Sequence, residues 1–248
     1  MNEDNAEKTE RIAKRMARAG VCSRRDAEKL IAEGRVAVNG SIIDTPATKV
    51  SEKDTIELDG KLVGKKEKSR LWIYHKPVGL VTSHKDEQGR KTVFDTLPKK
   101  MPRVISVGRL DLNSEGLLLL TNDGEVSRYL EMPSTALERK YRVRAFGRIT
   151  QKELDSLKDG VVIDGVIYKS IKAVLEKSSN SVTNSWIEIT LTEGKNREIR
   201  KVLEHLGLKV NRLIRIAYGE FKLGKLPEGQ VNEVSDAEMK RIFGDRFS

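Results

Sequence analysis

A short apolar run that follows a glycine-bounded polar loop is the most constraining feature of this sequence. Four consecutive leucines occupy residues 117–120, directly after the loop of residues 108–116. The run is much too short to span a membrane and is typical of a buried strand. Gly108 and Gly116 give the loop the backbone freedom that such a turn needs. The sequence therefore predicts a carboxylate, Asp111, held in a loop beside a core strand.

The balance of charges indicates an anionic partner. The chain of 248 residues contains 47 Lys and Arg against 37 Asp and Glu, a net charge of +10. Nucleic acid is the commonest partner of such a basic protein, although many solvated lysines would give the same composition. Aromatic residues make up only 5% of the chain, too few for the stacking platforms of a single-strand binder. We therefore expect a protein that recognises the shape of an RNA and one of its loops.

The few cysteine and histidine residues limit which disulfides and metal sites the protein can form. Cys22 is the single cysteine, which excludes an intrachain disulfide and a cysteine-cluster metal site. The three histidines are scattered without the spacing of metal ligands. The N-terminus lacks the apolar core of a signal peptide, and no segment reaches the roughly 18 apolar residues of a membrane helix. We expect a cytoplasmic protein without a metal site and without a membrane partner.

The N-terminal part of the chain predicts a small ααβ module. Apolar residues recur at helical spacing in two short segments, residues 12–17 and 27–31, each followed by a glycine. Ser23 precedes the second segment as a capping residue, with Asp26 in the reciprocal position of a capping box. Asn39-Gly40 then stands between two short apolar runs, which is a strong signal for a β-hairpin.

The two predicted helices concentrate positive charge. Residues 11–35 contain eight basic and three acidic side chains, whereas the basic and acidic totals over residues 1–63 are equal. Any one of these cations could simply form a weak pair on its own helix. Together they predict one polarised face that contacts the phosphates of a structured RNA. The candidate contacts on this face are Arg11, Lys14, Arg15, Arg18, Arg24 and Arg25.

A charged segment separates this module from the rest of the chain. Residues 64–70 are nearly devoid of apolar side chains and are typical of a flexible linker. We place an RNA-binding domain at residues 1–63 and a catalytic domain at residues 71–248. The pattern beyond the linker predicts an α+β fold around a mixed, mostly antiparallel sheet. The expected strands are residues 71–74, 140–145, 186–191 and 213–216, and the expected helices are residues 124–131, 151–158 and 197–206.

Several motifs resemble those of one enzyme family. Residues 107–124 closely resemble the catalytic motif of the ribosomal pseudouridine synthases, and Lys76-Pro77-Val78-Gly79 is similar to an early motif of the same family. The order and spacing of residues 11–40 resemble the S4 RNA-binding domain. The first resemblance extends over residues 71–225, nearly all of the second domain. It implies an enzyme that acts as a monomer and converts a uridine of ribosomal RNA to pseudouridine without a cofactor.

The resemblance assigns roles to three residues. Asp111 matches the catalytic aspartate, Tyr141 the tyrosine that stacks near the target uracil, and Arg200 the basic residue paired with the aspartate. On the residues alone, each has a simpler explanation: a turn aspartate, a core aromatic, and a helix arginine paired with Glu204. An ionised Asp111 could attack the sugar or abstract its 2′ proton, and the sequence leaves both routes open.

Further basic residues complete the expected RNA surface. The resemblance places Arg109 beside the flipped nucleotide, and we expect Asn196 to cap the helix that carries Arg200. The residues expected to contact RNA phosphates in the second domain are Lys195, Arg197, Lys201, Lys209, Arg212 and Arg215.

The target and the competing functions can also be compared from the motifs. Residues 113–116 and 132–141 look more like the large-subunit enzymes, which predicts a uridine of 23S rRNA or its precursor, of the position-2605 type. A small-subunit 16S rRNA enzyme and a non-catalytic ribosome-assembly factor are the alternatives, and the second predicts loss of the Asp, Tyr and Arg set. A glycosidase would need a second catalytic carboxyl, for which Glu115 and Asp123 are weak candidates.

Overall fold

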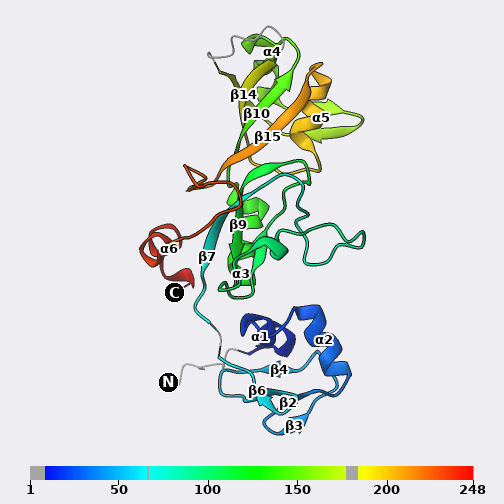
Figure 1. Cartoon of the computed structure of the whole chain (residues 1–248), viewed down its shortest axis with the longest axis vertical. Helices are drawn as coiled ribbons and strands as arrows, with labels where there is room; N and C mark the ends of the chain where they lie inside the picture. Colours follow the sequence, from blue (N-terminus) through cyan, green and yellow to red (C-terminus); the bar gives the residue numbers. More distant parts are fainter. Residues whose placement is uncertain (1–8, 66, 177–183, 248) are drawn as a thin grey trace, which may run out of the picture.

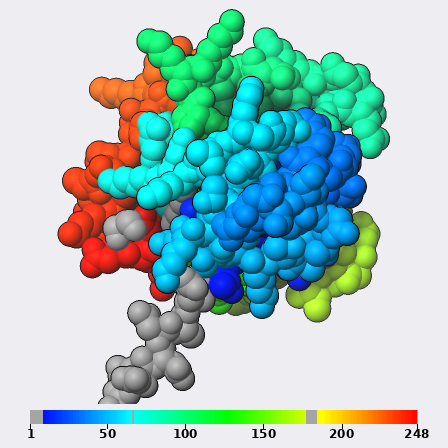
Figure 2. All heavy atoms as spheres, turned by 90° about the horizontal axis from the view of Figure 1, so that it is seen from below, coloured from blue at the N-terminus to red at the C-terminus, as the bar shows by residue number. Residues whose placement is uncertain are grey.

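The protein is built from two parts that follow one another along its longest axis (Figure 1). The computed structural model describes residues 9–65, 67–176 and 184–247. An N-terminal module, residues 10–62, lies at one end, and a main domain, residues 71–247, forms the rest. Figure 2 shows the module covering the main domain when the molecule is seen from that end. None of the described helices is long and apolar enough to cross a membrane.

The N-terminal module has the predicted ααβ composition. Its two helices share one apolar core with the strands, and Ile12, Met16 and Ile31 are fully buried in it. The strands form a four-stranded sheet in the order β3-β2-β5-β6 and a separate pair, β1 with β4. The elements are β1 (Glu10–Arg11), α1 (Ile12–Arg18), α2 (Arg24–Ala32), β2 (Val36–Val38), β3 (Ser41–Ile42), β4 (Lys49–Val50), β5 (Ile56–Leu58) and β6 (Lys61–Leu62).

Two local predictions in this module are confirmed. The Ser23 hydroxyl accepts a hydrogen bond from the Asp26 amide at 3.0 Å and lies 2.6 Å from the Asp26 carboxylate. Because aspartate is one methylene shorter than glutamate, it bonds the Ser23 hydroxyl in place of the backbone amide that a usual capping box uses. Asn39 and Gly40 both have positive φ, 51° and 81°, as a two-residue hairpin turn requires.

A nine-stranded sheet organises the main domain, and it is mixed and mostly antiparallel, as predicted. Its strands follow the order β13-β14-β10-β15-β9-β7-β17, with β8 beside β9 and β16 beside β15. Within it, β15 and β9 form the parallel pair. The strands are β7 (Leu71–Lys76), β8 (Ile105–Val107), β9 (Glu115–Thr121), β10 (Arg139–Phe146), β13 (Lys172–Leu175), β14 (Asn184–Leu191), β15 (Lys209–Tyr218), β16 (Phe221–Lys222) and β17 (Val231–Glu233).

Helices and a small hairpin cover this sheet. The first predicted helix appears with the expected bounds, and the third is one residue shorter at each end. The second divides into α4 and a 3-10 turn over Ser156–Asp159. The remaining elements are α3 (Gly124–Glu131), α4 (Gln151–Asp155), β11 (Val161–Ile163), β12 (Val166–Tyr168), α5 (Glu198–His205) and α6 (Asp236–Phe243).

Strand β9 contains the leucine run and is buried over its whole length. Leu117 and Leu119 pack in one apolar cluster, whereas Leu118 and Leu120 pack in another. Successive side chains of a strand point to opposite faces, so both faces of β9 are covered. Burial on both faces explains a run of apolar residues without polar alternation.

The last residues of the connector are bound to the main domain. Ser69 is 3% exposed, and its hydroxyl donates to the Asp123 carboxylate at 2.8 Å. Arg70 donates two hydrogen bonds to the Glu233 carboxylate, each at 2.6 Å. The expectation of a free connector is therefore wrong for these two residues, because their polar groups find partners on the adjacent strands and loops.

Candidate active site

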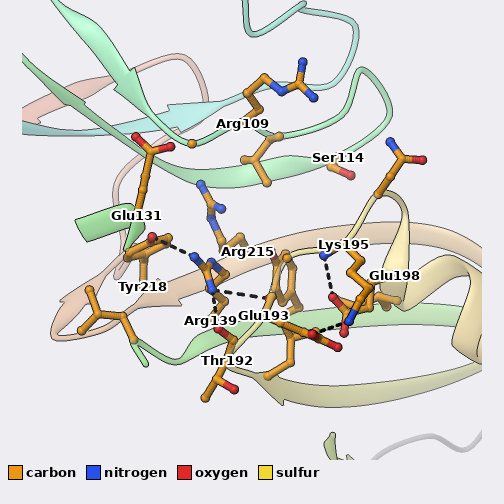
Figure 3. Close-up of a pocket in the computed structure, with 18 of the residues that line it drawn as sticks. Arg109, Ser114, Glu131, Arg139, Thr192, Glu193, Lys195, Glu198, Arg215 and Tyr218 are labelled. Atoms are coloured by element: carbon orange, nitrogen blue, oxygen red, sulfur yellow. Dashed lines mark hydrogen bonds and ion pairs between the residues drawn. The ribbon is translucent and has the colours of Figure 1, made fainter. Parts of the chain in front are cut away.

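A pocket of about 590 Å³ lies where the segments before β9, before β10 and before α5 meet. Asp111 and Tyr141 both line it, together with the predicted RNA contacts Arg109, Lys195, Arg197 and Arg215. Figure 3 shows Arg109 and Ser114 on one side of the pocket, with Lys195 and Glu198 on the segment across from them. The fold thus brings the two residues closest to the predicted chemistry into one cavity.

A buried lysine holds the loop that carries Asp111. Lys76 ends strand β7 and is 0% exposed. Its ammonium donates to the carbonyl oxygens of Pro77 at 3.0 Å, Asp111 at 3.1 Å and Ser114 at 2.8 Å, which uses all three of its hydrogens. Burial lowers the pKa of Lys76 to about 8, while the negative charge of Asp111 acts in the opposite direction.

The role of Lys76 was missed from the sequence, where it counted only as part of a motif. The available signal was a lysine directly after the apolar residues 71–74 and before a proline. A charged side chain in a buried strand needs partners, and the backbone of the Asp111 loop supplies them. Lys76 is therefore a positioning residue for this loop.

Gly116 allows β9 to approach β15 closely just behind the Asp111 loop. Its φ is +103°, and a Cβ atom at this position would lie 2.3 Å from the backbone oxygen of Arg215. A side chain here would force the parallel pair of strands apart. The glycine predicted from loop geometry is thus required by packing as well.

Arg200 reaches the Asp111 loop, although it forms no ion pair with the Asp111 carboxylate in the described part of the chain. Its guanidinium donates to the carbonyl oxygens of Asn113 at 2.8 Å and Val210 at 3.1 Å. Burial lowers the pKa of Arg200, and the negative charge of Asp111 opposes that effect. Arg200 therefore braces the loop through its backbone, and the predicted direct pairing does not appear.

Tyr141 lies on β10 across the pocket from the Asp111 loop. Its ring packs against both the cluster around β14 and the cluster around Trp72 and Leu118. The pairing of β10 with β15 shifts register between Lys140 and Tyr141. Such irregularities redirect side chains, and they are common beside functional sites.

Arg215 is a correction to the expected phosphate contacts. It is 3% exposed, its Nε donates to the Leu117 carbonyl at 2.7 Å, and its guanidinium lies 5.3 Å from the centre of the Tyr218 ring. Pairing of β15 with β9 buries this side chain under the pocket. A phosphate on the outer surface cannot reach it, whereas its positive charge acts on whatever occupies the cavity.

Two carboxyl groups missed by the sequence analysis lie beside Lys195. Glu193 forms an ion pair with the Lys195 side chain at 2.5 Å, and Glu198 accepts a hydrogen bond from the Lys195 amide at 2.9 Å. Glu198 is 4% exposed, and its Oε1 atom has no hydrogen-bond partner among the described residues. Burial raises the pKa of Glu198 to about 7, the Lys195 amide opposes this, and the charge of Glu193 adds to it. A protonated Glu198 can donate toward Glu193.

The start of α5 differs from the expected one. Arg197, not Asn196, occupies the cap position, and it makes no side-chain capping bond. Arg197 has left-handed backbone angles, φ 52° and ψ 28°. This conformation costs a residue with a side chain about 1 to 2 kcal/mol and tends to occur at functional sites. The Arg197 side chain is exposed, and Arg197 is one of the residues that line the pocket.

The predicted cations of the N-terminal module divide into two groups. Arg11, Arg24 and Arg25 are exposed. Arg15 is 8% exposed and faces Glu10, so its prediction as a phosphate contact is wrong. Lys14 and Arg18 are engaged within the protein by carboxylates of the main domain. Two exposed cations of the main domain form ion pairs, Arg212 with Glu115 and Lys195 with Glu193. The predicted RNA contacts of the main domain that are exposed are Arg109, Lys195, Arg197, Lys201, Lys209 and Arg212.

Comparison with known proteins gives consistent results. The sequence pattern of RNA pseudouridylate synthases matches residues 70–205, and that of the S4 domain matches residues 10–56. An RNA pseudouridine synthase of Rickettsia bellii is 55% identical over 228 residues, 91% of this chain and 97% of the relative. Ribosomal large subunit pseudouridine synthase B of Salmonella typhi is 42% identical over 245 residues, 95% of this chain and 83% of the relative. A crystal structure of a pseudouridylate synthase superposes with a TM-score of 0.65 at 26% identity, covering 94% of this chain and 99% of that one.

Lys76→Met tests the role of the buried ammonium. Methionine has a similar length but donates no hydrogen bond, so three carbonyl oxygens lose their partner at a cost of about 1 to 3 kcal/mol each. We expect turnover to fall at least about a hundredfold as the Asp111 loop loosens, with RNA affinity within a few-fold of wild type. Single-turnover kinetics and filter binding measure the two quantities. Lys222→Met, at an exposed position, is the control, and unchanged turnover in Lys76→Met would refute the positioning role.

Glu198→Gln tests the protonation of the buried carboxyl. The folded-state pKa of about 7 lies above the ordinary 4.5, so the wild type loses stability as pH rises from 4.5 to 7. Glutamine does not titrate, so the variant should gain up to about 3 kcal/mol over the wild type across this range. Denaturant unfolding at pH 4.5, 6 and 8 measures the difference, with Glu52→Gln, at an exposed position, as the control. A difference that does not change with pH would show that folding does not raise the pKa of Glu198.

Proposed function

Because this chain belongs to the RNA pseudouridylate synthase family, we propose that it isomerises a uridine of 23S rRNA to pseudouridine with Asp111 as its catalytic residue. The observation that carries the proposal is the pocket in which Asp111, on a clamped loop, and Tyr141 share one cavity. A relative that is 42% identical is named ribosomal large subunit pseudouridine synthase B, which supports the large subunit as the source of the substrate.

The reaction needs no net oxidation or reduction. The C1′–N1 bond of uridine breaks, the uracil turns, a C1′–C5 bond forms, and the C5 proton leaves. Asp111 can open this sequence by attacking C1′ or by removing the 2′ proton. Both routes require a carboxylate that is available to the sugar. The cations around the Asp111 loop bind its backbone carbonyls and leave the carboxylate available.

The surroundings of the pocket suit the other steps. Tyr141 offers an aromatic face against which the uracil can stack. Negative charge develops on the uracil when the C1′–N1 bond breaks, and Arg215, fixed beneath the cavity, is placed to offset it. In this proposal Arg215, and not Arg200, balances the charge on the uracil. Arg200 in turn keeps the Asp111 loop in position.

Access to the pocket requires a flipped nucleotide. A volume of about 590 Å³ is large enough for one nucleoside, which must leave its stack to enter. Unstacking a base costs a few kcal/mol, which contacts to the RNA backbone must offset. Exposed cations that line the pocket, Arg109, Lys195 and Arg197, are placed to make them, and Lys201 is exposed nearby in the sequence on α5.

The exact target is part of the proposal. We propose a uridine of the position-2605 type, in 23S rRNA or an assembly intermediate that contains it. Pseudouridine-specific chemical mapping of both ribosomal RNAs, in cells with and without the gene, tests this. Loss of one modified site in 23S rRNA is the expected result. Loss of a site in 16S rRNA would instead favour the small-subunit alternative, and no change would count against the proposal.

Asp111→Asn tests the catalytic assignment. The amide keeps the shape of the side chain but can act neither as an anionic nucleophile nor as a base. We expect pseudouridine formation to disappear while RNA affinity stays within a few-fold of wild type, measured by tritium release from [5-³H]uridine RNA and by filter binding. Asp159→Asn, on the exposed turn after α4, is the matched control. Turnover within tenfold of wild type would remove Asp111 from the mechanism.

Arg200→Ala and Lys201→Ala, two neighbours on α5, separate positioning from phosphate binding. Arg200 is half-buried against the Asp111 loop, whereas Lys201 is exposed. Alanine at 200 should lower kcat by at least about tenfold with little change in affinity, because the loop loses a brace. Alanine at 201 should do the reverse and reduce the salt slope of binding by roughly 0.9 or less. Equal losses of kcat and affinity in Arg200→Ala would indicate a phosphate contact.

A further inference from the structure

Helix α1 of the N-terminal module is joined to helix α3 of the main domain by ion pairs. The Lys14 ammonium lies 2.6 Å from Glu125, and the Arg18 guanidinium lies 3.5 Å from Asp123 and 3.7 Å from Glu125. Glu10 completes the group, 3.4 Å from Lys14 and 3.1 Å from Arg18. We call these five residues the junction cluster.

The junction cluster is better placed to hold two domains together than an ordinary surface ion pair. The side chains of Asp123 and Arg18 are only 5% and 13% exposed, so solvent and salt screen them weakly. Asp123 is itself fixed, because it caps α3 through the Glu125 amide at 2.8 Å and accepts the Ser69 hydroxyl. Carboxylates at the start of a helix are also favoured by its dipole. The main domain thus presents a rigid acidic receptor to Lys14 and Arg18.

The N-terminal module also lies close to the main domain at a second place, the start of α2. Burial raises the pKa of the Cys22 thiol, and the positive charge of Arg103 opposes it. The Ser23 hydroxyl lowers the pKa of Asp26, and the charge of Lys85 adds to that effect. Both cations belong to the loop between β7 and β8, so this loop lies beside the start of α2. Figure 2 shows the blue helix of the module against the teal-green atoms of this loop.

The consequence is a set of cations from two domains on one surface. Arg24 and Arg25 begin α2 and are exposed, and Lys85 is exposed on the adjacent loop. The Arg24 guanidinium also lies next to Gly124 at the start of α3. We call Arg24, Arg25, Lys85 and Arg103 the junction surface. Neither Lys85 nor Arg103 was among the RNA contacts expected from the sequence.

We propose that the junction cluster fixes the N-terminal module so that the junction surface forms one composite phosphate-binding site for the stem of the RNA substrate. The proposal rests on the proposed function, because it takes the partner to be the RNA whose uridine enters the pocket. Lys14 and Arg18 then act as clamps between domains and not as phosphate contacts.

The length of β9 sets the distance between the Asp111 loop and the junction cluster. The Asp111 loop lies at the start of β9, and the junction cluster lies just after its end. Seven residues of strand at about 3.3 Å each span roughly 23 Å. An RNA must therefore reach about this far from its target uridine to contact the junction surface. A short hairpin would engage the pocket alone, whereas a longer stem would engage both sites.

Fixing the module increases affinity without any new contact. A loosely tethered module would bind the stem with an effective concentration set by its linker, whereas a docked module is already in place. The junction cluster should therefore strengthen binding of long stems and leave binding of short ones unchanged. This difference separates a clamp from general damage to the fold.

Charge reversal in the full-length protein tests the proposal. Glu125→Lys repels Lys14 and Arg18, and Glu238→Lys makes the same change in the first turn of α6, outside the junction cluster. The substrates are a short and a long stem-loop that share one target uridine. For Glu125→Lys we expect roughly tenfold weaker binding of the long stem. The salt slope should shrink by about 0.9 for each lost phosphate contact. Binding of the short stem should match that of Glu238→Lys.

Two further variants make the test specific. Combining Lys14→Glu with Glu125→Lys restores opposite charges across the junction and should recover most of the lost affinity. Replacing Arg24 and Arg25 with alanine should reproduce the loss for the long stem, and adding Glu125→Lys should then change little. Small-angle X-ray scattering should show a larger radius of gyration for Glu125→Lys alone.

Several results would overturn the proposal. The proposal fails if Glu125→Lys binds the long stem as tightly as Glu238→Lys does. It also fails if Glu125→Lys loses the same affinity for the short stem as for the long stem. Failure of the proposed function is a separate result: wild-type protein would then form no pseudouridine on either stem, whatever the junction variants show in binding.

Discussion

Burial of β9 on both faces is the constraint on which the rest of this molecule depends. The strand packs in two apolar clusters, one on each face. The Asp111 loop precedes it, and the carboxylates that receive the N-terminal module follow it. A strand packed on both sides cannot slide without exposing leucines to water, at about 1.5 to 3 kcal/mol for each side chain. The active site and the domain junction are therefore held at a fixed separation.

The cationic side chains around the pocket bind backbone carbonyl oxygens and also make the electrostatic potential of the pocket more positive. Lys76 and Arg200 bind carbonyl oxygens of the Asp111 loop, and Arg215 binds the Leu117 carbonyl. Anchoring this loop through its backbone places the Asp111 carboxylate without using the hydrogen-bonding capacity of the carboxylate itself. The same cations still lower the energy of negative charge in the cavity.

The sequence predicted what local pattern determines and missed what distant packing determines. The Ser23 cap, the Asn39-Gly40 turn and the leucine strand depend on neighbours in the chain, and all three are confirmed. The family was recognised because several motifs occur in order, and the comparisons confirm it. The burial of Arg15 and Arg215 and the cross-domain partners of Lys14 depend on elements far away in sequence. Periodicity carries no information on such contacts, so those cations were all expected to face RNA.

The parallel pairing of β9 with β15 has a mechanical consequence. Two residue pairs, Ile214 with Glu115 and Arg215 with Gly116, join the half of the sheet that carries Tyr141 to the half that carries the Asp111 loop. The pocket is lined from both halves, so the separation of the Tyr141 ring from the Asp111 carboxylate depends on this short pairing. Bending at the β9–β15 pairing would therefore widen the pocket without any change within either half of the sheet.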